Sequence, residues 1–332
     1  GAAVPEELGG TGLSNVELGI LSEAMGRYGV PAQIFLTIHF ARQLLHVKDP
    51  GLRDEMIGRL LRGDLVICGA YTEPGCGSDA AAITTRAVKE GDYYVVNGEK
   101  AFVSGPGISD IYIISARTWE GAPKLHLGIS LLLVEREREG VEPYELKTMA
   151  TEYEGDFGGV RFTDVEVPAG HLVGEENMGF KLLMAELSML RVHVALLGLG
   201  AAEMCLEEAI KYAKQRKAFG KPISKFQGVS FRLAEHWTKL EAAKLLAYKA
   251  LWLADRGKPS MALASAAKWY GCEVAFYAIN DALQTLGAAG YTADYPLERA
   301  FRLVRGLLIG DGTTNIQKLI ISRALFGREY AP

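Results

Sequence analysis

The feature that most constrains the fold is a double change of periodicity along the chain. Apolar residues follow helical spacing from about 14 to 64, short β-rich runs occupy about 68 to 172, and helical spacing then returns almost to the C-terminus. This order disfavours a nicotinamide-binding fold, in which strands and helices alternate around a Gly-rich turn. We predict an α+β protein with domains at 1–67, 68–172 and 173–332.

Individual elements follow from the local patterns. Asn97 and Gly98 lie between two β-rich runs and indicate a hairpin. The predicted strands contain residues 93–96, 111–114, 129–134 and 160–162. The predicted C-terminal helices, which resemble a bundle, lie at 177–215, 223–256, 259–287 and 313–326.

Composition limits the classes of partner. The formal net charge is −4 and no basic block is present, so a nucleic-acid partner is not expected. No uninterrupted apolar run approaches the roughly 20 residues of a membrane-spanning helix, so we expect a cytoplasmic protein. The 4 cysteines are scattered and predict reduced thiols, with neither disulfides nor a metal site. The chain opens on Gly1 without an initiator Met, and we expect N-terminal elements to be missing.

Five segments have residues suited to chemistry. Residues 70–79 (AYTEPGCGSD) and 97–105 (NGEKAFVSG) offer small residues, hydroxyls and an aromatic side chain for a phosphate or a flat cofactor. Residues 216–222 (RKAFGKP) suit a pyrophosphate and an adenine. The other two are 284–291 (QTLGAAGY) and 309–317 (IGDGTTNIQ). Each has an ordinary alternative: a polar loop, a strand with a core Phe, or the end of a helix.

Together and in this order, the segments resemble the acyl-CoA dehydrogenase family over essentially the whole chain. Further matches are VPEELGG at 4–10, FTDVEVP at 162–168 and PLER at 296–299. The resemblance implies an acyl-CoA dehydrogenase-like fold, with a helical N-terminal domain, a central β-barrel domain and a C-terminal four-helix bundle. It implies FAD as cofactor, a homotetramer in which a neighbouring subunit completes the flavin site, and an electron-transferring flavoprotein as partner.

The implied reaction is α,β-desaturation of an acyl-CoA thioester. A carboxylate removes the α-proton while hydride passes from the β-carbon to flavin N5. The resemblance assigns substrate contacts to Ser78, Arg191 and Gly310. It assigns FAD contacts to Tyr71, Thr72, Gly77, Ser78, Phe102, Ser104, Arg216, Phe219, Gln227, Gln284, Gly287, Gly290, Thr313 and Asn315.

The base is where the chain departs from the family pattern. Most members have Glu before Gly-Thr in the fifth segment, and a minority have the base at the position of Leu190, whereas this chain has Asp311. We predict Asp311 as the base, with Glu186 in reserve; the alternatives are a turn or N-cap role for Asp311 and a solvated helix position for Glu186. Gly310 stands where straight-chain enzymes often have Tyr, which favours a branched or cyclic acyl group.

Two other functions on this fold remain open from the sequence. An acyl-CoA oxidase or another flavin enzyme would pass electrons to oxygen, and a non-catalytic flavoprotein would bind a thioester without desaturating it. A eukaryotic source would place the protein in the mitochondrial matrix.

Overall fold

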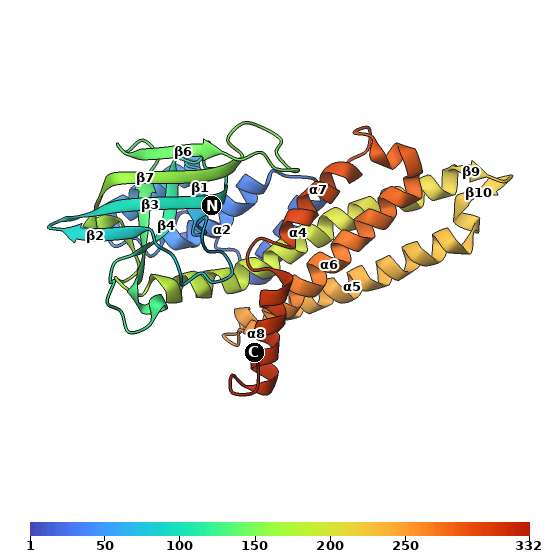
Figure 1. The fold of residues 1–332 in the computed structure, drawn as a ribbon. Coiled ribbons are helices and arrows are strands. Elements are labelled where there is room, and N and C mark those ends of the chain that lie inside the picture. The colour runs from blue at the N-terminus through green and yellow to red at the C-terminus, as the bar shows by residue number, and fades with distance from the viewer. The chain divides into compact units, whose positions relative to one another are not determined.

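The computed structural model describes residues 1–332, which divide into two compact units (Figure 1). A β unit comprises Gly1–Leu13 and Pro31–Glu186, and a helical unit comprises Ser14–Val30 and Leu187–Pro332. The first helix of the chain therefore belongs with the C-terminal helices. The predicted division into three domains stays a prediction.

The β unit combines one sheet with two complete α-helices and the start of α4 (Gly179–Gln215), as far as Glu186. The complete helices are α2 (Ala32–Leu44) and α3 (Pro50–Arg62). The strands are β1 (Ile67–Ala70), β2 (Arg86–Glu90), β3 (Tyr93–Ser104), β4 (Ile111–Arg117), β5 (Ile129–Glu135), β6 (Val141–Glu145), β7 (Phe157–Pro168) and β8 (Leu172–Val173). Seven of them follow the order β6-β7-β3-β2-β4-β5-β8, and β1 pairs with β4 in parallel. All four predicted strand runs are confirmed.

Burial explains why two of these strands read as continuous apolar runs. Residues 111–116 of β4 and 129–134 of β5 are buried on both faces, whereas β3 alternates buried and exposed positions along much of its length. Short 3-10 helices lie at Glu6–Leu8, Leu125–Gly128 and Ala169–His171.

The hairpin predicted at Asn97-Gly98 is wrong. β3 runs through both residues, and the turn lies instead between β2 and β3, at Gly91 with a φ of 61°. The Asn97 side chain donates to and accepts from Asp164 on β7, and a Cβ at Gly98 would lie 2.6 Å from the Thr85 hydroxyl. The Asn-Gly pair therefore marks a strand irregularity with close neighbours rather than a turn.

The helical unit is built from five α-helices and part of a sixth. These are α1 (Asn15–Arg27), α4 (Gly179–Gln215, from Leu187), α5 (Gln227–Asp255), α6 (Met261–Leu286), α7 (Leu297–Leu307) and α8 (Thr314–Phe326). Two short strands, β9 (Lys217–Ala218) and β10 (Lys221–Pro222), form a small hairpin, and 3-10 helices lie at Ile223–Lys225 and Gly287–Tyr291. The four predicted helices are confirmed, and α7 was not predicted.

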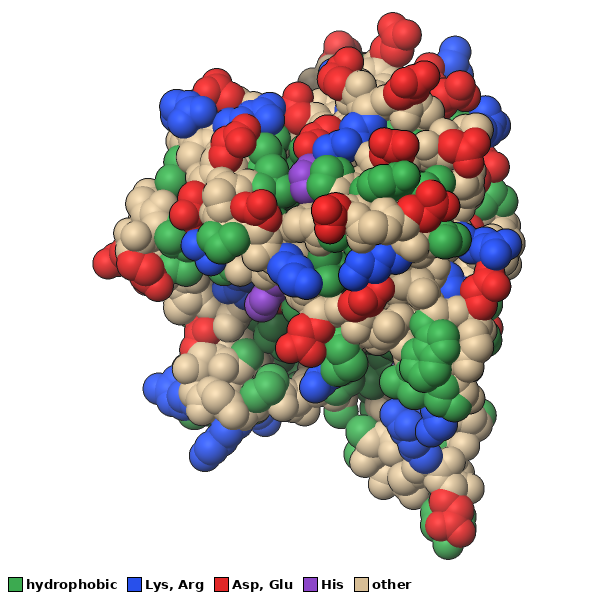
Figure 2. All heavy atoms as spheres, turned by 90° about the vertical axis from the view of Figure 1, so that its left-hand side faces the viewer, with side chains coloured by type: hydrophobic (Ala, Val, Ile, Leu, Met, Phe, Trp, Pro, Cys, Tyr) green, Lys and Arg blue, Asp and Glu red, His purple; other side chains and the backbone are tan.

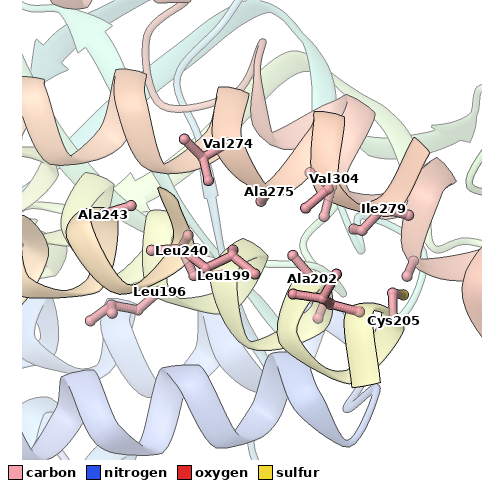
Figure 3. Packing of buried hydrophobic residues seen from close by; sticks show 14 of the residues in the cluster. Leu196, Leu199, Ala202, Cys205, Leu240, Ala243, Val274, Ala275, Ile279 and Val304 are labelled. Atoms are coloured by element: carbon pink, nitrogen blue, oxygen red, sulfur yellow. The ribbon is translucent and has the colours of Figure 1, made fainter. Parts of the chain in front are cut away.

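Small side chains let the helices of this unit approach closely. α4, α5, α6 and α7 contribute Leu199, Ala243, Ala275 and Val304 to one buried cluster (Figure 3). A Cβ on Gly26 of α1 would lie 1.8 Å from the Leu197 carbonyl oxygen of α4. α4 is long and apolar enough to span a membrane by length and composition, but most of its apolar segment is buried inside the protein, as in the core helix of a bundle.

Charges are dispersed on one face of the protein. Acidic and basic side chains intermingle on the face shown in Figure 2, without a block of one sign. This distribution agrees with the small net charge of −4.

Candidate active site

Asp311 lies on a left-handed turn between α7 and α8. Its φ is 54° and that of Gly312 is 91°. A non-glycine residue in this region is strained by about 1–3 kcal/mol and persists only where the surroundings hold it. Asp311 does not cap α8, because Thr313 is the N-cap and its hydroxyl accepts from the Ile316 amide at 3.4 Å. The N-cap alternative for Asp311 is therefore wrong.

Two buried side chains bind the carbonyl groups of this turn. Nζ of Lys268, on α6, donates to the Gly312 carbonyl oxygen at 2.7 Å. Nε2 of Gln317, on α8, donates to the same oxygen at 2.9 Å and to the Asp311 carbonyl oxygen at 3.2 Å. Lys268 is 1% and Gln317 is 0% exposed, so these bonds are shielded from water.

The electrostatics of the turn are set by one carboxylate and two cations. Burial raises the pKa of Asp311 above its ordinary value, and the charges of Lys268 and Arg191 oppose that rise. Burial lowers the pKa of both cations, while Asp311 favours their charged forms. The region around Asp311 is therefore positive overall, which stabilises negative charge near the turn.

Arg191 and Gly310, both predicted substrate contacts, lie in the helical unit with Asp311. Arg191 of α4 is buried, and its Nη1 donates to the Ser265 hydroxyl at 3.2 Å. Gly310 is exposed, and a Cβ there would meet only the Gly306 carbonyl oxygen, at 3.8 Å. The space beside Gly310 within this unit is therefore open.

Glu186, the reserve base, belongs to the β unit. Burial raises its pKa, whereas Arg42 and His46 lower it. It is half-buried rather than solvated. His39, on the same α2 helix as Arg42, is buried against the Phe35 ring at 4.5 Å, and burial lowers its pKa to about 3. His39 thus has the surroundings of a structural histidine.

A buried ion pair fixes the loop that contains Tyr71 and Thr72. Lys100 Nζ lies 2.8 Å from Glu73 Oε1, and the two side chains are 0% and 3% exposed. Lys100 also donates to the Tyr71 carbonyl oxygen at 3.3 Å, and the Ala101 amide donates to the Thr72 carbonyl oxygen at 2.9 Å.

Glu73 is further held by the chain that follows the loop. It accepts from the Thr84 amide and hydroxyl and from the Thr85 amide, at 2.7–2.9 Å. Burial opposes its ionisation, but Lys100 and these donors lower its pKa to about 2. Burial lowers the pKa of Lys100 to about 8 against the attraction of Glu73.

Phe102 and Ser104 lie near the end of β3, next to the buried Ala101 and Val103. Phe102 is 60% exposed and has a φ of 56°, at an irregularity in the pairing of β3 with β7. An exposed aromatic ring in a strained backbone is suited to stack on a planar group. Ser104 is half-buried, and Gly77 and Ser78 are exposed.

The remaining predicted cofactor residues lie in the helical unit, at the ends of its helices or in the segments that connect them. Phe219, between β9 and β10, is 95% exposed with a φ of 50°. Gly290 is buried in the 3-10 helix after α6, while Thr313 is half-buried at the start of α8. The others are exposed: Arg216, Gln227, Gln284, Gly287 and Asn315.

Sequence reasoning missed Lys268, Gln317, Lys100 and Glu73 as parts of the site. A signal for Lys268 was available, because it lies on the face of α6 that also carries Ala264, Gly271 and Cys272, all of which are buried. A lysine on an apolar helical face is rarely buried unless it has a partner.

Comparison with known proteins identifies the family. Residues 68–165 match the acyl-CoA dehydrogenase middle domain, and residues 177–326 match the acyl-CoA dehydrogenase C-terminal domain. The chain is 38% identical to the 3-(aryl)acrylate reductase of Clostridium sporogenes over 98% of its length and 86% of that protein. The chain belongs to the acyl-CoA dehydrogenase family of oxidoreductases.

Other members of the acyl-CoA dehydrogenase family agree in sequence and fold. Isobutyryl-CoA dehydrogenase of Dictyostelium discoideum is 36% identical, with 98% of this chain and 78% of that protein covered. The crystal structure of an acyl-CoA dehydrogenase from Geobacillus kaustophilus matches with a TM-score of 0.93 and 33% identity, over 98% of this chain and 86% of that one. The predicted fold, with N-terminal helices, a central β domain and a C-terminal helical domain, is confirmed.

Three more similar proteins have names that bear on cofactor, partner and substrate. The FAD complex of PigA matches with a TM-score of 0.91 and 28% identity, over 98% of this chain and 86% of that one. The caffeyl-CoA reductase-Etf complex subunit CarC of Acetobacterium woodii is 36% identical over 98% of this chain and 86% of that protein. Cyclohexane-1-carbonyl-CoA dehydrogenase of Geobacter metallireducens is 33% identical over 97% of this chain and 84% of that protein. Members of the acyl-CoA dehydrogenase family bind FAD, as the PigA complex illustrates.

Proposed function

We propose that the protein catalyses FAD-dependent α,β-desaturation of an acyl-CoA thioester whose acyl group is branched or cyclic, with Asp311 as the base. The observation that carries this proposal is the fixed left-handed turn that holds Asp311 beside two buried cations and next to Gly310. Membership of the acyl-CoA dehydrogenase family supports the class of reaction, and the turn supports Asp311 as the base.

Asp311 has the properties of a general base for a weakly acidic C–H group. Its pKa is raised by burial, which increases its affinity for the proton, while Lys268 and Arg191 limit that rise and favour the ionised form. Asp311 takes the α-proton, and the surrounding positive charge stabilises the negative charge that develops on the thioester carbonyl oxygen.

The residues assigned to FAD fit a planar ring system and a pyrophosphate. Phe102 offers an exposed ring on a strained backbone, and Tyr71 and Thr72 lie on a loop held by the Lys100–Glu73 pair. Arg216 and Phe219 offer an exposed guanidinium and an exposed ring for the cofactor of a neighbouring subunit. The chemistry supplied by bound FAD is acceptance of the β-hydride, which leaves the substrate as the new double bond forms.

The proposed substrate class follows from the size of the groups next to the base. Asp is shorter than the usual Glu by one methylene, about 1.5 Å, which leaves room for a substituent on the α-carbon. Gly310 adds open space on the same turn, since a Cβ there would have only one neighbour within 4 Å. Relatives named for isobutyryl-CoA and cyclohexane-1-carbonyl-CoA support branched or cyclic acyl groups.

We further propose partners and location from the family. A relative named as a subunit of an Etf complex supports an electron-transferring flavoprotein as electron acceptor. Exposed aromatic side chains that lie together on α5 and α6 support a homotetramer, because exposed apolar patches mark interfaces; they are Phe231 and Tyr277, which line one open pocket. The protein acts in the bacterial cytoplasm, or in the mitochondrial matrix if its source is eukaryotic.

The test is anaerobic titration of the FAD-loaded protein with butyryl-, isobutyryl-, cyclohexane-1-carbonyl- and 3-arylpropionyl-CoA. We expect the branched or cyclic esters to bleach the flavin absorbance faster than butyryl-CoA, and Asp311→Asn to abolish bleaching. Normal bleaching by Asp311→Asn would refute the assignment of the base. Faster bleaching by butyryl-CoA would refute the substrate class.

Gly310→Tyr is the matched specificity variant. Gly310 does not have a positive φ, and the space around it is open, so Tyr is accommodated in the turn. We expect Gly310→Tyr to retain FAD and to shift preference towards the straight chain. An unchanged preference among the acyl-CoA esters would show that Gly310 does not determine substrate specificity.

The reverse reaction is a second candidate, supported by the relative named 3-(aryl)acrylate reductase. Burial raises the pKa of Asp311, which increases the fraction of its carboxyl group that is protonated and available as a general acid. In this direction Asp311 protonates the α-carbon of a 2-enoyl thioester. Mixing the chemically reduced protein with an arylacrylyl-CoA and following the return of flavin absorbance distinguishes the two directions by their rates.

A further inference from the structure

Lys268 is the most deeply buried Lys or Arg of the helical unit, and no contact with substrate or cofactor is proposed for it. It is 1% exposed on α6, and Nζ donates to the Gly312 carbonyl oxygen at 2.7 Å. Burying an ammonium group is costly unless bonds and charges compensate for it. The compensation found here comes from the turn that holds Asp311.

The contacts of Lys268 give it two separable effects on that turn. Its hydrogen bond fixes the peptide next to Asp311, an effect shared with the neutral Gln317, which donates to the same oxygen at 2.9 Å. Its charge attracts the Asp311 carboxylate, an effect that Gln317 does not share. Lys268 thus holds the turn and favours the ionised form of the Asp311 carboxyl group, whereas Gln317 only holds the turn.

We infer that Lys268 is a positioning residue of the active site, which fixes the Asp311–Gly312 turn through the Gly312 carbonyl group and keeps the Asp311 carboxylate ionised between turnovers. This inference rests on the proposed role of Asp311 as base. It assigns to Lys268 no contact with substrate or cofactor.

The other charged groups around the turn do not replace Lys268. Arg191 on α4 also favours ionised Asp311, and it remains in every variant described below. Cys272 on α6 is neutral, because burial raises its pKa to about 11. Lys318 on α8 faces Glu273 at 4.0 Å.

The test compares Lys268→Gln, which keeps a hydrogen-bond donor without the charge, with Lys268→Arg, which keeps the charge. The rate of anaerobic flavin bleaching is followed from pH 5 to 9 with the ester that reacts fastest. A base must be ionised, so the rate falls as the pH falls through its pKa. We expect this fall to move to higher pH in Lys268→Gln, with bleaching at pH 7 slowed about tenfold, part of the 10²–10⁴ that a positioned base contributes. Lys268→Arg should keep the wild-type midpoint.

Gln317→Leu is the matched control for the hydrogen bond alone. It removes a donor to the same carbonyl group but no charge, so we expect slower bleaching with an unchanged midpoint. If Lys268→Gln behaves like Gln317→Leu, with no change in midpoint, the charge role is overturned. If Lys268→Gln does not fold, a shifted midpoint in Lys268→Arg overturns the inference in its place.

A second readout needs no turnover. In the FAD-free protein, the infrared band of the protonated Asp311 carboxyl group is identified as the one absent from Asp311→Asn and is followed against pH. We expect this band to persist to higher pH in Lys268→Gln than in wild type, and equal titration would overturn the inference. Normal bleaching by Asp311→Asn would instead refute the base itself, so that the two failures are distinguishable.

Discussion

The buried Lys100–Glu73 pair makes a sharp prediction about stability. Lys100→Met removes the ammonium group and leaves the Glu73 carboxylate buried, still accepting from Thr84 and Thr85. Methionine is unbranched and of similar length, so the packing around β3 is largely kept. The change therefore isolates the cost of an uncompensated buried carboxylate.

The magnitude follows from the titration of the pair. The pKa of Glu73 is lowered from 4.5 to about 2, and at about 1.4 kcal/mol per pH unit this corresponds to about 3 kcal/mol in favour of the ionised carboxylate. Removing one partner of a buried pair costs about 3–5 kcal/mol. Burial lowers the pKa of Lys100 to about 8, so its removal also relieves a penalty, and we expect the low end of that range. For a unit of this size, about 3 kcal/mol lowers Tm by about 6–12 °C.

The pH dependence has a defined sign. The folded-state pKa of Glu73 lies below the unfolded value, so its contribution is fully present above about pH 4.5 and is lost as the pH falls towards about 2. The difference in free energy of unfolding between wild type and Lys100→Met should be constant from about pH 5 to 7 and should shrink below that range. Thermal and urea unfolding, followed by circular dichroism, measure both quantities.

Two variants control this experiment. Glu73→Gln combined with Lys100→Met removes both charges while keeping an acceptor for the Thr85 amide, and we expect it to recover more than half of the loss. Lys147→Met, at an exposed position, should change stability by less than about 0.5 kcal/mol. The reasoning is refuted if Lys100→Met unfolds within 1–2 °C of wild type, roughly the error expected for a surface change, or if the double variant is no more stable than the single one.

Three further predictions concern strain, packing and thiols. Phe102→Gly should change the free energy of unfolding of the FAD-free protein by less than about 1 kcal/mol relative to wild type, because relief of the positive φ offsets the lost side chain. The same variant should bind FAD more weakly in a fluorescence titration. Unchanged FAD binding would contradict the proposed role of Phe102. Gly26→Ala should destabilise the protein by about 3 kcal/mol or prevent folding, because the new Cβ would lie 1.8 Å from the Leu197 carbonyl oxygen. The control Gly228→Ala should be tolerated in the same unfolding assay, because no atom lies within 4 Å of the position of its Cβ. Of the four thiols, only that of Cys76 is not buried. The native protein should therefore react with at most one equivalent of a thiol reagent, and the unfolded protein with four. Reaction of the native protein with more than one equivalent would contradict the burial of the other three thiols.

The fold was predictable where periodicity extends over many residues. The helices α4, α5 and α6 each span more than 25 residues, and the runs in β4 and β5 are buried on both faces. The 11 residues of α7 were missed because the helix is short and charged, and follows the Pro296 that suggested a break. The hairpin at Asn97-Gly98 was predicted wrongly because the hydrogen bonds of Asn97 to Asp164 belong to the pairing of two strands, which no local sequence pattern reveals.

The site was predictable only as far as motifs define it. The family resemblance identified Asp311 and Phe102 by position, but the strained backbone of both residues is a property of the folded chain. Lysine usually lies on the protein surface, so residue type alone does not predict that Lys100 and Lys268 are buried. The partners that compensate their charges, Glu73 and Gly312, lie 27 and 44 residues away in sequence, so only the folded chain identifies these partners.

In each unit a buried lysine fixes a backbone segment of the proposed site. Lys268 donates to the Gly312 carbonyl group next to Asp311, whose φ is 54°; Lys100, two residues before Phe102 with its φ of 56°, donates to the Tyr71 carbonyl group. A flexible surface loop would relax such a conformation, because the strain amounts to about 1–3 kcal/mol. A lysine buried with its charge compensated cannot move without exposing that charge to an apolar interior, so it resists this relaxation. Each lysine therefore holds one backbone segment in place: Lys268 holds the turn of Asp311, which we propose to face substrate, and Lys100 holds the loop of Tyr71, which we propose to face FAD.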